Sequence, residues 1–105
     1  MSGTKYDSGK ADLSLLPLVA LEQMARAFMY GEAKYARYNY CKGFDTHRLI
    51  GAALRHINQW QNGEDLDPES GASHLGHALA SIAMLLHIME LGTARDTRYK
   101  REVKP

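Results

Sequence analysis

Hydrophobic residues recur at three- and four-residue spacing in three stretches of this chain, and no stretch shows the strict alternation of a half-buried strand. The stretches cover roughly residues 14–31, 46–62 and 74–91. Each is long enough for about four or five helical turns. The pattern therefore predicts an all-α fold, a small helical bundle of three main helices.

Proline, glycine and helix-capping residues predict where each helix begins and ends. Pro17 is tolerated in the first turn of a helix that starts near Ser14, because its missing N–H would have no partner there. Gly31 interrupts or ends that helix, and Gly92 ends the third. The remaining caps are Asp45 or Thr46 for the second helix and Ser70 or Ser73 for the third.

Each helix is expected to bury one apolar stripe. The stripes are Leu18, Leu21, Met24, Ala25 and Phe28; Leu49, Ile50, Ala53, Leu54, Ile57 and Trp60; and Leu75, Ala78, Leu79, Ile82, Leu85, Leu86 and Met89. His74, His77 and Ser81 form a column beside the third stripe, and His56 lies at the edge of the second. In a chain of only 105 residues, the apolar stripes of the three helices can cover one another only in part. We therefore expect a homodimer or higher homo-oligomer whose interface completes a four-helix-type core.

Composition places the chain among globular proteins. Hydrophobic residues make up 45% and charged residues 24%, and the net charge of +1 gives no reason to expect nucleic acid as a partner. Cys41 is the lone cysteine, which favours a reducing, cytoplasmic setting. The segment 75–91 is too short and too rich in histidine to suggest a membrane span. We expect a domain over residues 1–92 and a solvated basic tail over 93–105.

Candidate chemistry is concentrated between the second and third helices. Glu64, Asp67 and Glu69 offer hard oxygen ligands of the kind that Mg²⁺ or Mn²⁺ prefers, usually together with substrate phosphates. Three histidines flank this loop and are further ligands or proton carriers: His56, His74 and His77. The segment matches neither an EF-hand nor an HExxH helix. A plain polar connection is the competing interpretation.

A tyrosine-rich patch over residues 30–40 is a second candidate. Its aromatic rings could stack on a base while Lys34 meets phosphate, although tyrosines that cover a core edge give the same pattern. Lys10, in a turn-like N-terminal segment, could also reach a phosphate, but the segment lacks the spacing of a Walker loop.

Taken in order, several segments resemble the small phage MazG-like nucleotide pyrophosphohydrolases known as dATP/dGTP diphosphohydrolases. The segments that carry the resemblance are Tyr6-Asp7-Ser8-Gly9-Lys10, Leu15-Leu16-Pro17, Tyr30-Gly31-Glu32-Ala33-Lys34-Tyr35, Asn39-Tyr40, Arg55-His56, Trp60, Gly63-Glu64, Asp67-Pro68-Glu69-Ser70-Gly71 and His74-Leu75-Gly76-His77-Ala78. Together they span about nine-tenths of the chain, leaving out the basic tail.

The resemblance implies an all-α enzyme that converts dATP or dGTP to the monophosphate and pyrophosphate with Mg²⁺ or Mn²⁺. On this hypothesis the catalytic residues are Glu64, Asp67 and His56; the metal ligands are Glu64, Asp67, Glu69, His74 and His77; and the substrate-binding residues are Lys10, Lys34, Tyr35, Asn39, Arg55 and Trp60. The chain departs from the broader superfamily in one respect. It has no EExxE, and its ExxD, from Glu64 to Asp67, precedes the last helix instead of lying within it.

Two other classes of protein remain open. One is a non-catalytic phage accessory module that binds metal structurally or contacts DNA through its basic tail. The other is a nucleotide-binding protein without catalysis, which the missing EExxE would fit.

Overall fold

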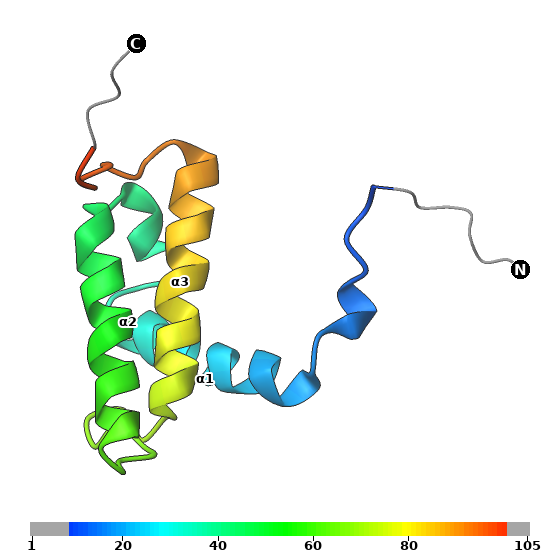
Figure 1. The fold of residues 1–105 in the computed structure, drawn as a ribbon, viewed down its shortest axis with the longest axis vertical. Helices are drawn as coiled ribbons and strands as arrows, with labels where there is room; N and C mark the ends of the chain where they lie inside the picture. The colour runs from blue at the N-terminus through cyan, green and yellow to red at the C-terminus, as the bar shows by residue number, and fades with distance from the viewer. Residues whose placement is uncertain (1–8, 101–105) are drawn as a thin grey trace, which may run out of the picture.

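The computed structural model describes residues 9–100, and over this range the prediction of an all-α fold with three main helices is confirmed (Figure 1). The elements are η1 (Leu13–Leu15), α1 (Leu18–Lys34), η2 (Asn39–Lys42), α2 (Thr46–Gln61) and α3 (His74–Leu91). Helices α2 and α3 form an antiparallel hairpin, and α1 crosses behind α3 (Figure 1). The segment before α1 leads away from this bundle.

The ends of α2 and α3 lie where the sequence predicts them. Ser73 caps α3, since its hydroxyl accepts the N–H groups of Leu75 and Gly76. Gly92 ends α3 in the left-handed conformation, with a φ of 77°. Asp45 occupies the N-cap position of α2, but its carboxylate pairs with Arg95 instead of capping the helix.

The predicted bounds of the first helix are wrong at both ends. Pro17 is the N-cap residue of α1, so the helix begins after it at Leu18. Residues 13–15 form a separate 3₁₀ turn, which the carboxylate of Asp12 caps through the N–H of Ser14. At the other end, Gly31 does not stop the helix, which continues to Lys34. Glycine costs a helix only about 1 kcal/mol, which neighbouring turns readily offset.

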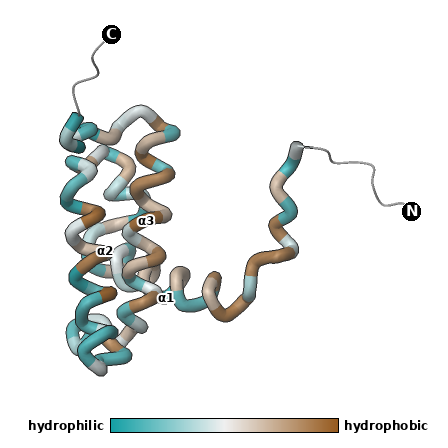
Figure 2. Tube along the Cα trace, viewed as in Figure 1, coloured by the Kyte–Doolittle hydropathy of each residue, from teal (hydrophilic) through white to brown (hydrophobic). Residues whose placement is uncertain are grey.

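The predicted buried stripe of α3 is wrong for most of its members in the isolated chain. The helix buries His74, Gly76, Ala78, Ala80, Ser81 and Ile88, of which Ala78 belongs to the predicted stripe. Five large apolar side chains of that stripe instead expose 41–68% of their surface: Leu75, Leu79, Ile82, Leu86 and Met89. Because α3 is apolar on most sides, its sequence alone does not say which side faces its neighbours (Figure 2).

Small residues allow α1 to pack closely against α3. Ala27 of α1 and Ala80 of α3 are both buried. A Cβ atom added at Gly76 would lie 2.5 Å from the backbone oxygen of Gln23, closer than a carbon and an oxygen can approach. The backbones of the two helices therefore nearly touch where they cross, next to the first turn of α3.

The chain after Gly92 returns to the start of α2 in what we call the C-terminal strap, residues 93–97. Arg95 donates its N–H to the carbonyl of Phe44 and accepts the N–H of Thr46, each at 2.9 Å. The hydroxyl of Thr97 contacts the Thr46 hydroxyl at 3.2 Å. The first part of the segment expected to be a solvated tail thus packs on α2 and closes that end of the hairpin.

Within the described residues, α3 is the one helix long and apolar enough to cross a membrane. This differs from the sequence-based expectation that the segment is too short. The observation is weak evidence for a span, because core helices of many globular proteins meet the same criterion. Here α3 packs against both α1 and α2.

Replacing Gly76 with alanine should destabilise the protein by about 1–3 kcal/mol, because the added methyl group forces α1 away from α3. Gly31→Ala is the control, since a Cβ atom there meets nothing within 4 Å. That change should instead stabilise α1 by roughly 0.4–1 kcal/mol. Urea denaturation followed by circular dichroism measures both. Equal effects of the two substitutions would contradict the close approach of the helices.

A candidate metal centre between α2 and α3

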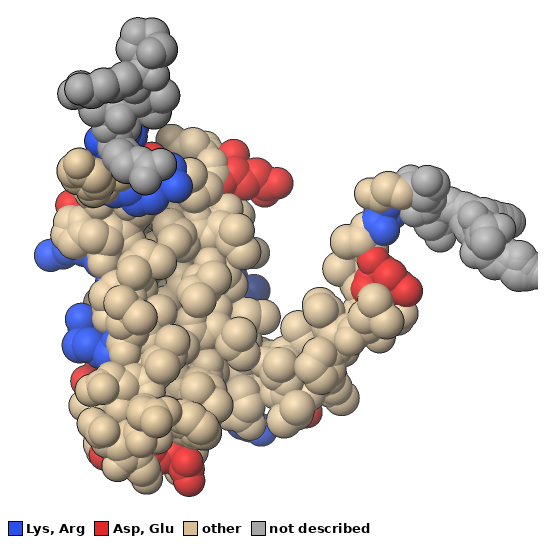
Figure 3. Space-filling view, viewed as in Figure 1, with Lys and Arg blue, Asp and Glu red and all other residues tan. Residues whose placement is uncertain are grey.

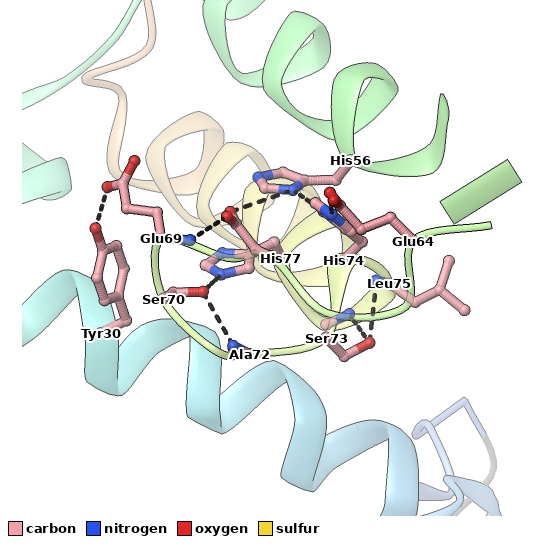
Figure 4. Close-up of polar contacts among 12 residues, drawn as sticks. Tyr30, His56, Glu64, Glu69, Ser70, Ala72, Ser73, His74, Leu75 and His77 are labelled. Atoms are coloured by element: carbon pink, nitrogen blue, oxygen red, sulfur yellow. Dashed lines mark hydrogen bonds and ion pairs between the residues drawn. The ribbon is translucent and has the colours of Figure 1, made fainter. Parts of the chain in front are cut away.

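Three side chains from separate parts of the chain converge between the end of α2 and the start of α3. The Nδ1 atoms of His56 and His74 are 2.9 Å apart, and Oδ2 of Asp67 lies 4.0 Å from Nδ1 of His56. One ligand atom from each residue lies within 4.8 Å of the other two. Figure 4 shows the rings of His56 and His74 directed toward each other. Two imidazole nitrogens and one carboxylate oxygen facing a common point form a donor set for a divalent transition-metal ion.

Local hydrogen bonds hold the connecting loop in the shape that presents Asp67. His74, the first residue of α3, donates its N–H to the carbonyl of Asp65 at 3.0 Å. Asp67 donates its N–H to the carbonyl of Ala72 at 2.8 Å, and its own carbonyl accepts the N–H of Gly71 at 2.7 Å. The loop is therefore tied to the start of α3 at several points, and the position of Asp67 relative to the two histidines is fixed.

Glu64 determines the protonation of the His74 ring. Its Oε1 atom lies 2.7 Å from Nε2 of His74, whose side chain is only 4% exposed. An ionised carboxylate only accepts hydrogen bonds, so Nε2 carries the proton. In neutral His74 the lone pair is then on Nδ1, which faces His56 and Asp67. Carboxylates orient metal-binding histidines in this way in many proteins.

His77 completes the histidine cluster without joining the donor set. Its ring stacks on that of His56 with centroids 4.6 Å apart and an interplanar angle of 11°. Nε2 of His77 lies 2.6 Å from the hydroxyl of Ser70, which also accepts the N–H of Ala72. Ser70 therefore links the backbone of the loop to the ring of His77.

Burial favours the neutral form of His56 and His77. Desolvation lowers the pKa of His56, and the neighbouring His77 ring lowers it further. Desolvation also lowers the pKa of His77, although the nearby carboxylate of Asp67 opposes that shift. Neutral imidazoles carry the lone pairs that metal binding and proton transfer require.

Glu69 lies outside the cluster because other groups hold its carboxylate. It accepts hydrogen bonds from the hydroxyl of Tyr30 and, at 2.9 Å, from Nζ of Lys34. These bonds, with that of Tyr30 the larger cause, lower the pKa of Glu69. Glu69 therefore joins the loop to α1 and does not reach the three convergent ligand atoms.

A cavity of about 300 Å³ opens beside the histidine cluster, between α1 and the loop. Its lining residues are Arg26, Met29, Tyr30, Ser70, Gly71 and Ala72. Ser70 belongs both to this lining and to the hydrogen bond with His77, so the cavity and the cluster share a wall. Arg26 contributes the charged side chain of the cavity, and a guanidinium group binds phosphate oxygens well.

The structure brings together five of the predicted site residues: His56, Glu64, Asp67, His74 and His77. The arrangement differs from the predicted ligand set. His56 faces the common point, whereas Glu64 supports His74, Glu69 pairs with Lys34, and His77 contacts Ser70.

The predicted substrate-binding residues lie around the cluster and not within it. Lys34 is at the end of α1 with Tyr35 next to it, and both are exposed. Arg55 and Trp60 are exposed on α2. Asn39 begins η2, whose Tyr40 contacts His87 in the C-terminal half of α3, away from the cluster. Lys10 belongs to the segment that leads away from the bundle (Figure 1).

Sequence reasoning missed Ser70 and Arg26 as parts of the site. The sequence gives Ser70 no role in the site beyond a possible helix cap, and Ser73 takes that place. Its contact with His77 depends on the loop folding back over α3, which helical periodicity does not describe. Arg26 faces the cavity only because of the angle at which α1 crosses α3.

Comparison with known proteins gives two matches. Residues 1–98 match the family model described as dATP/dGTP diphosphohydrolase, N-terminal. A curated protein named dATP/dGTP diphosphohydrolase, from Salmonella phage PMBT28, is 35% identical over 98 residues. The alignment covers 93% of this chain but 33% of that protein, so the chain spans about a third of the length of its relative. No solved structure matches.

The free energy of unfolding of the metal-free protein should fall as the pH drops below about 6.5. The unfolded chain takes up protons near that pH, whereas the lowered pKa values of His56 and His77 keep the folded chain neutral to a lower pH. Urea denaturation in EDTA between pH 8 and pH 5 measures this slope. His56→Gln should flatten it, and His47→Gln, outside the cluster, should not. A slope that His56→Gln leaves unchanged would contradict the assignment.

Proposed function

Because the chain belongs to the dATP/dGTP diphosphohydrolase N-terminal family, we propose that it hydrolyses purine deoxynucleoside triphosphates to the monophosphate and pyrophosphate at the cluster between α2 and α3. The phage relative carries the name of this activity. Since the chain spans a third of that relative, assigning the activity to this part is a proposal. We expect it to act in the host cytoplasm, without nucleic acid or membrane as partner.

The observation that carries the proposal is the convergence of His56, Asp67 and His74 on a common point. These residues would hold the divalent ion, and Glu64 would keep the ring of His74 in the ligating tautomer. Two imidazole nitrogens favour Mn²⁺ or another transition-metal ion over Mg²⁺, which prefers an octahedron of oxygens. When bound, such an ion neutralises phosphate charge and lowers the pKa of water.

Residues at the cavity wall would bind the substrate and move the proton. Arg26 would hold phosphate oxygens in the cavity, and Tyr30, whose ring lines it, would pack against the base. With its Nε2–H donating to the Ser70 hydroxyl, which fixes the orientation of the ring, neutral His77 would accept a proton from the attacking water at Nδ1. Lys34, paired with Glu69 at the same end of α1, would add positive charge near the leaving pyrophosphate.

Nucleotide binding without hydrolysis is the second candidate function. It is favoured by the absence of an EExxE pattern from the sequence. DNA binding through the C-terminal end has less support, because Arg95 pairs with Asp45 and Arg98 with Asp96. Such pairing leaves fewer free cations for phosphates.

Pyrophosphate release from the eight common nucleoside triphosphates, assayed separately with Mn²⁺ and Mg²⁺, tests the proposed activity. We expect turnover of dATP and dGTP, faster with Mn²⁺, and a loss of at least about 100-fold in Asp67→Asn. Glu90→Gln, an exposed carboxylate near the far end of α3, is the control and should leave turnover unchanged. Unchanged turnover in Asp67→Asn would show that the site lies elsewhere.

Titration calorimetry with Mn²⁺ gives a readout that does not depend on turnover. Glu64→Gln should weaken Mn²⁺ binding by about 10–100-fold, because the amide no longer enforces the ligating tautomer of His74. If dGTP binds the wild-type protein but no pyrophosphate appears, the second candidate function is supported instead.

A further inference from the structure

The carboxylate of Glu69 occupies a position that suits an anionic ligand. It accepts hydrogen bonds from the hydroxyl of Tyr30 and from Nζ of Lys34, both on α1. Figure 4 shows the Glu69 side chain reaching from the loop toward α1, with its carboxylate at the Tyr30 hydroxyl and away from the ring of His74. An ammonium group and a phenolic O–H directed at one oxygen are donors that also bind phosphate. We call this donor pair the Tyr30–Lys34 site.

The site is part of a longer row of phosphate-binding groups on α1. Arg26, Tyr30 and Lys34 follow one another at four-residue spacing, which places them on one face of the helix. Arg26 and Tyr30 line the cavity beside the histidine cluster, and Nζ of Lys34 lies 5.7 Å from the centroid of the Tyr30 ring. Eight residues of α-helix separate the two cations by about 12 Å along the axis, which suits a chain of linked phosphates better than a single phosphate.

The two cations of this row have to offset the negative charge of the loop. Figure 3 shows Asp and Glu side chains gathered at the end of the bundle where α2 and α3 are joined. The connecting segment, residues 62–73, contains four carboxylates and neither lysine nor arginine. A phosphate chain that enters the cavity is therefore repelled by the loop, and the attraction comes from Arg26 and Lys34 of α1.

Glu69 cancels much of that attraction in the free protein. The hydrogen bonds from Tyr30 and Lys34 lower the pKa of Glu69, so the carboxylate is ionised at neutral pH. The pair is also open to solvent, since the side chains of Lys34 and Glu69 are 45% and 63% exposed. Exposed ion pairs contribute little to stability, so a ligand with more negative charge can replace the carboxylate at small cost.

We propose that Glu69 is a built-in competitor for the phosphates of the nucleotide: its carboxylate fills the Tyr30–Lys34 site until a polyphosphate displaces it. Every anion has to displace the carboxylate before it binds, so the site stays closed to weakly held anions such as inorganic phosphate. A pyrophosphate group carries more charge than one carboxylate and reaches Arg26 as well, so it opens the site. This inference rests on the proposed function, because the displacing anion is the phosphate chain of the proposed substrate.

Displacement of the carboxylate leaves the candidate metal centre in place. The backbone N–H of Glu69 donates to Oδ1 of Asp67 at 2.9 Å, a contact in which the Glu69 side chain takes no part. The side chain therefore rotates away from Lys34 while the backbone continues to hold Asp67. The anion site changes its occupant without a change in the position of the metal ligands.

Titration calorimetry with inorganic pyrophosphate, in buffer that contains EDTA, tests the proposal. Glu69→Gln keeps the size of the side chain but removes its charge, and it should bind pyrophosphate about 3–30-fold more tightly than the wild-type protein. Glu32→Gln is the matched control, because it removes an equal charge from the same end of α1, where Glu32 pairs with Arg37. Screening should keep its effect below about twofold. Inorganic phosphate should bind each protein more weakly than pyrophosphate does.

The Lys34→Gln variant separates competition from other effects of the Glu69 substitution. Without the ammonium group there is little left to compete for, so adding Glu69→Gln in this background should tighten pyrophosphate binding by less than about twofold. Circular dichroism and urea denaturation should show that each variant folds as the wild-type protein does, because the exchanged contacts are exposed.

Pyrophosphate binding that Glu69→Gln leaves unchanged or weakens would overturn the proposal, and so would an equal gain in Glu32→Gln. Undetectable pyrophosphate binding in every variant would show that the row on α1 is not an anion site. Since the titration needs neither metal nor turnover, its result is independent of the proposed hydrolysis. Tighter binding in Glu69→Gln together with no turnover of dGTP would contradict the proposed function alone.

Discussion

The candidate site depends on the hydrogen bonds of the buried His74 side chain. His74 opens α3, its backbone N–H is held by the loop, and its two ring nitrogens face Glu64 on one side and His56 of α2 on the other. One residue thus joins the three segments that build the site. A buried polar ring is stable only when both nitrogens have partners, so the same hydrogen bonds that satisfy His74 also align the cluster. The contacts that stabilise the fold at this point therefore also position the candidate ligand atoms.

Much of the architecture follows from local sequence signals. The capping serine at Ser73 and the glycine at Gly92 fix the ends of α3, because cap chemistry acts over only a few residues. The orientation of α3 could not be predicted in the same way. Apolar residues lie on more than one side of this helix, and the choice of buried side is made by Gly76 and Ala80, whose small size lets α1 approach. Hydrophobicity alone assigns the leucines to the core and misses this steric effect.

The candidate site was predictable as a region but not as a ligand set. The sequence places carboxylates and histidines close together along the chain. Which of these side chains converge depends on three contacts that the folded loop makes possible. Glu69 is held by Tyr30 and Lys34 of α1, and Ser70 turns back to His77. His56 meets His74 only because the loop reverses the chain over a short distance.

The C-terminal strap has a mechanical consequence. Backbone hydrogen bonds join Arg95 to Phe44 and Thr46, so the strap is anchored at the start of α2, at the opposite end of the hairpin from the histidine cluster. A pull on the strap would act first on the start of α2, whereas a pull on the loop would act directly on Asp67.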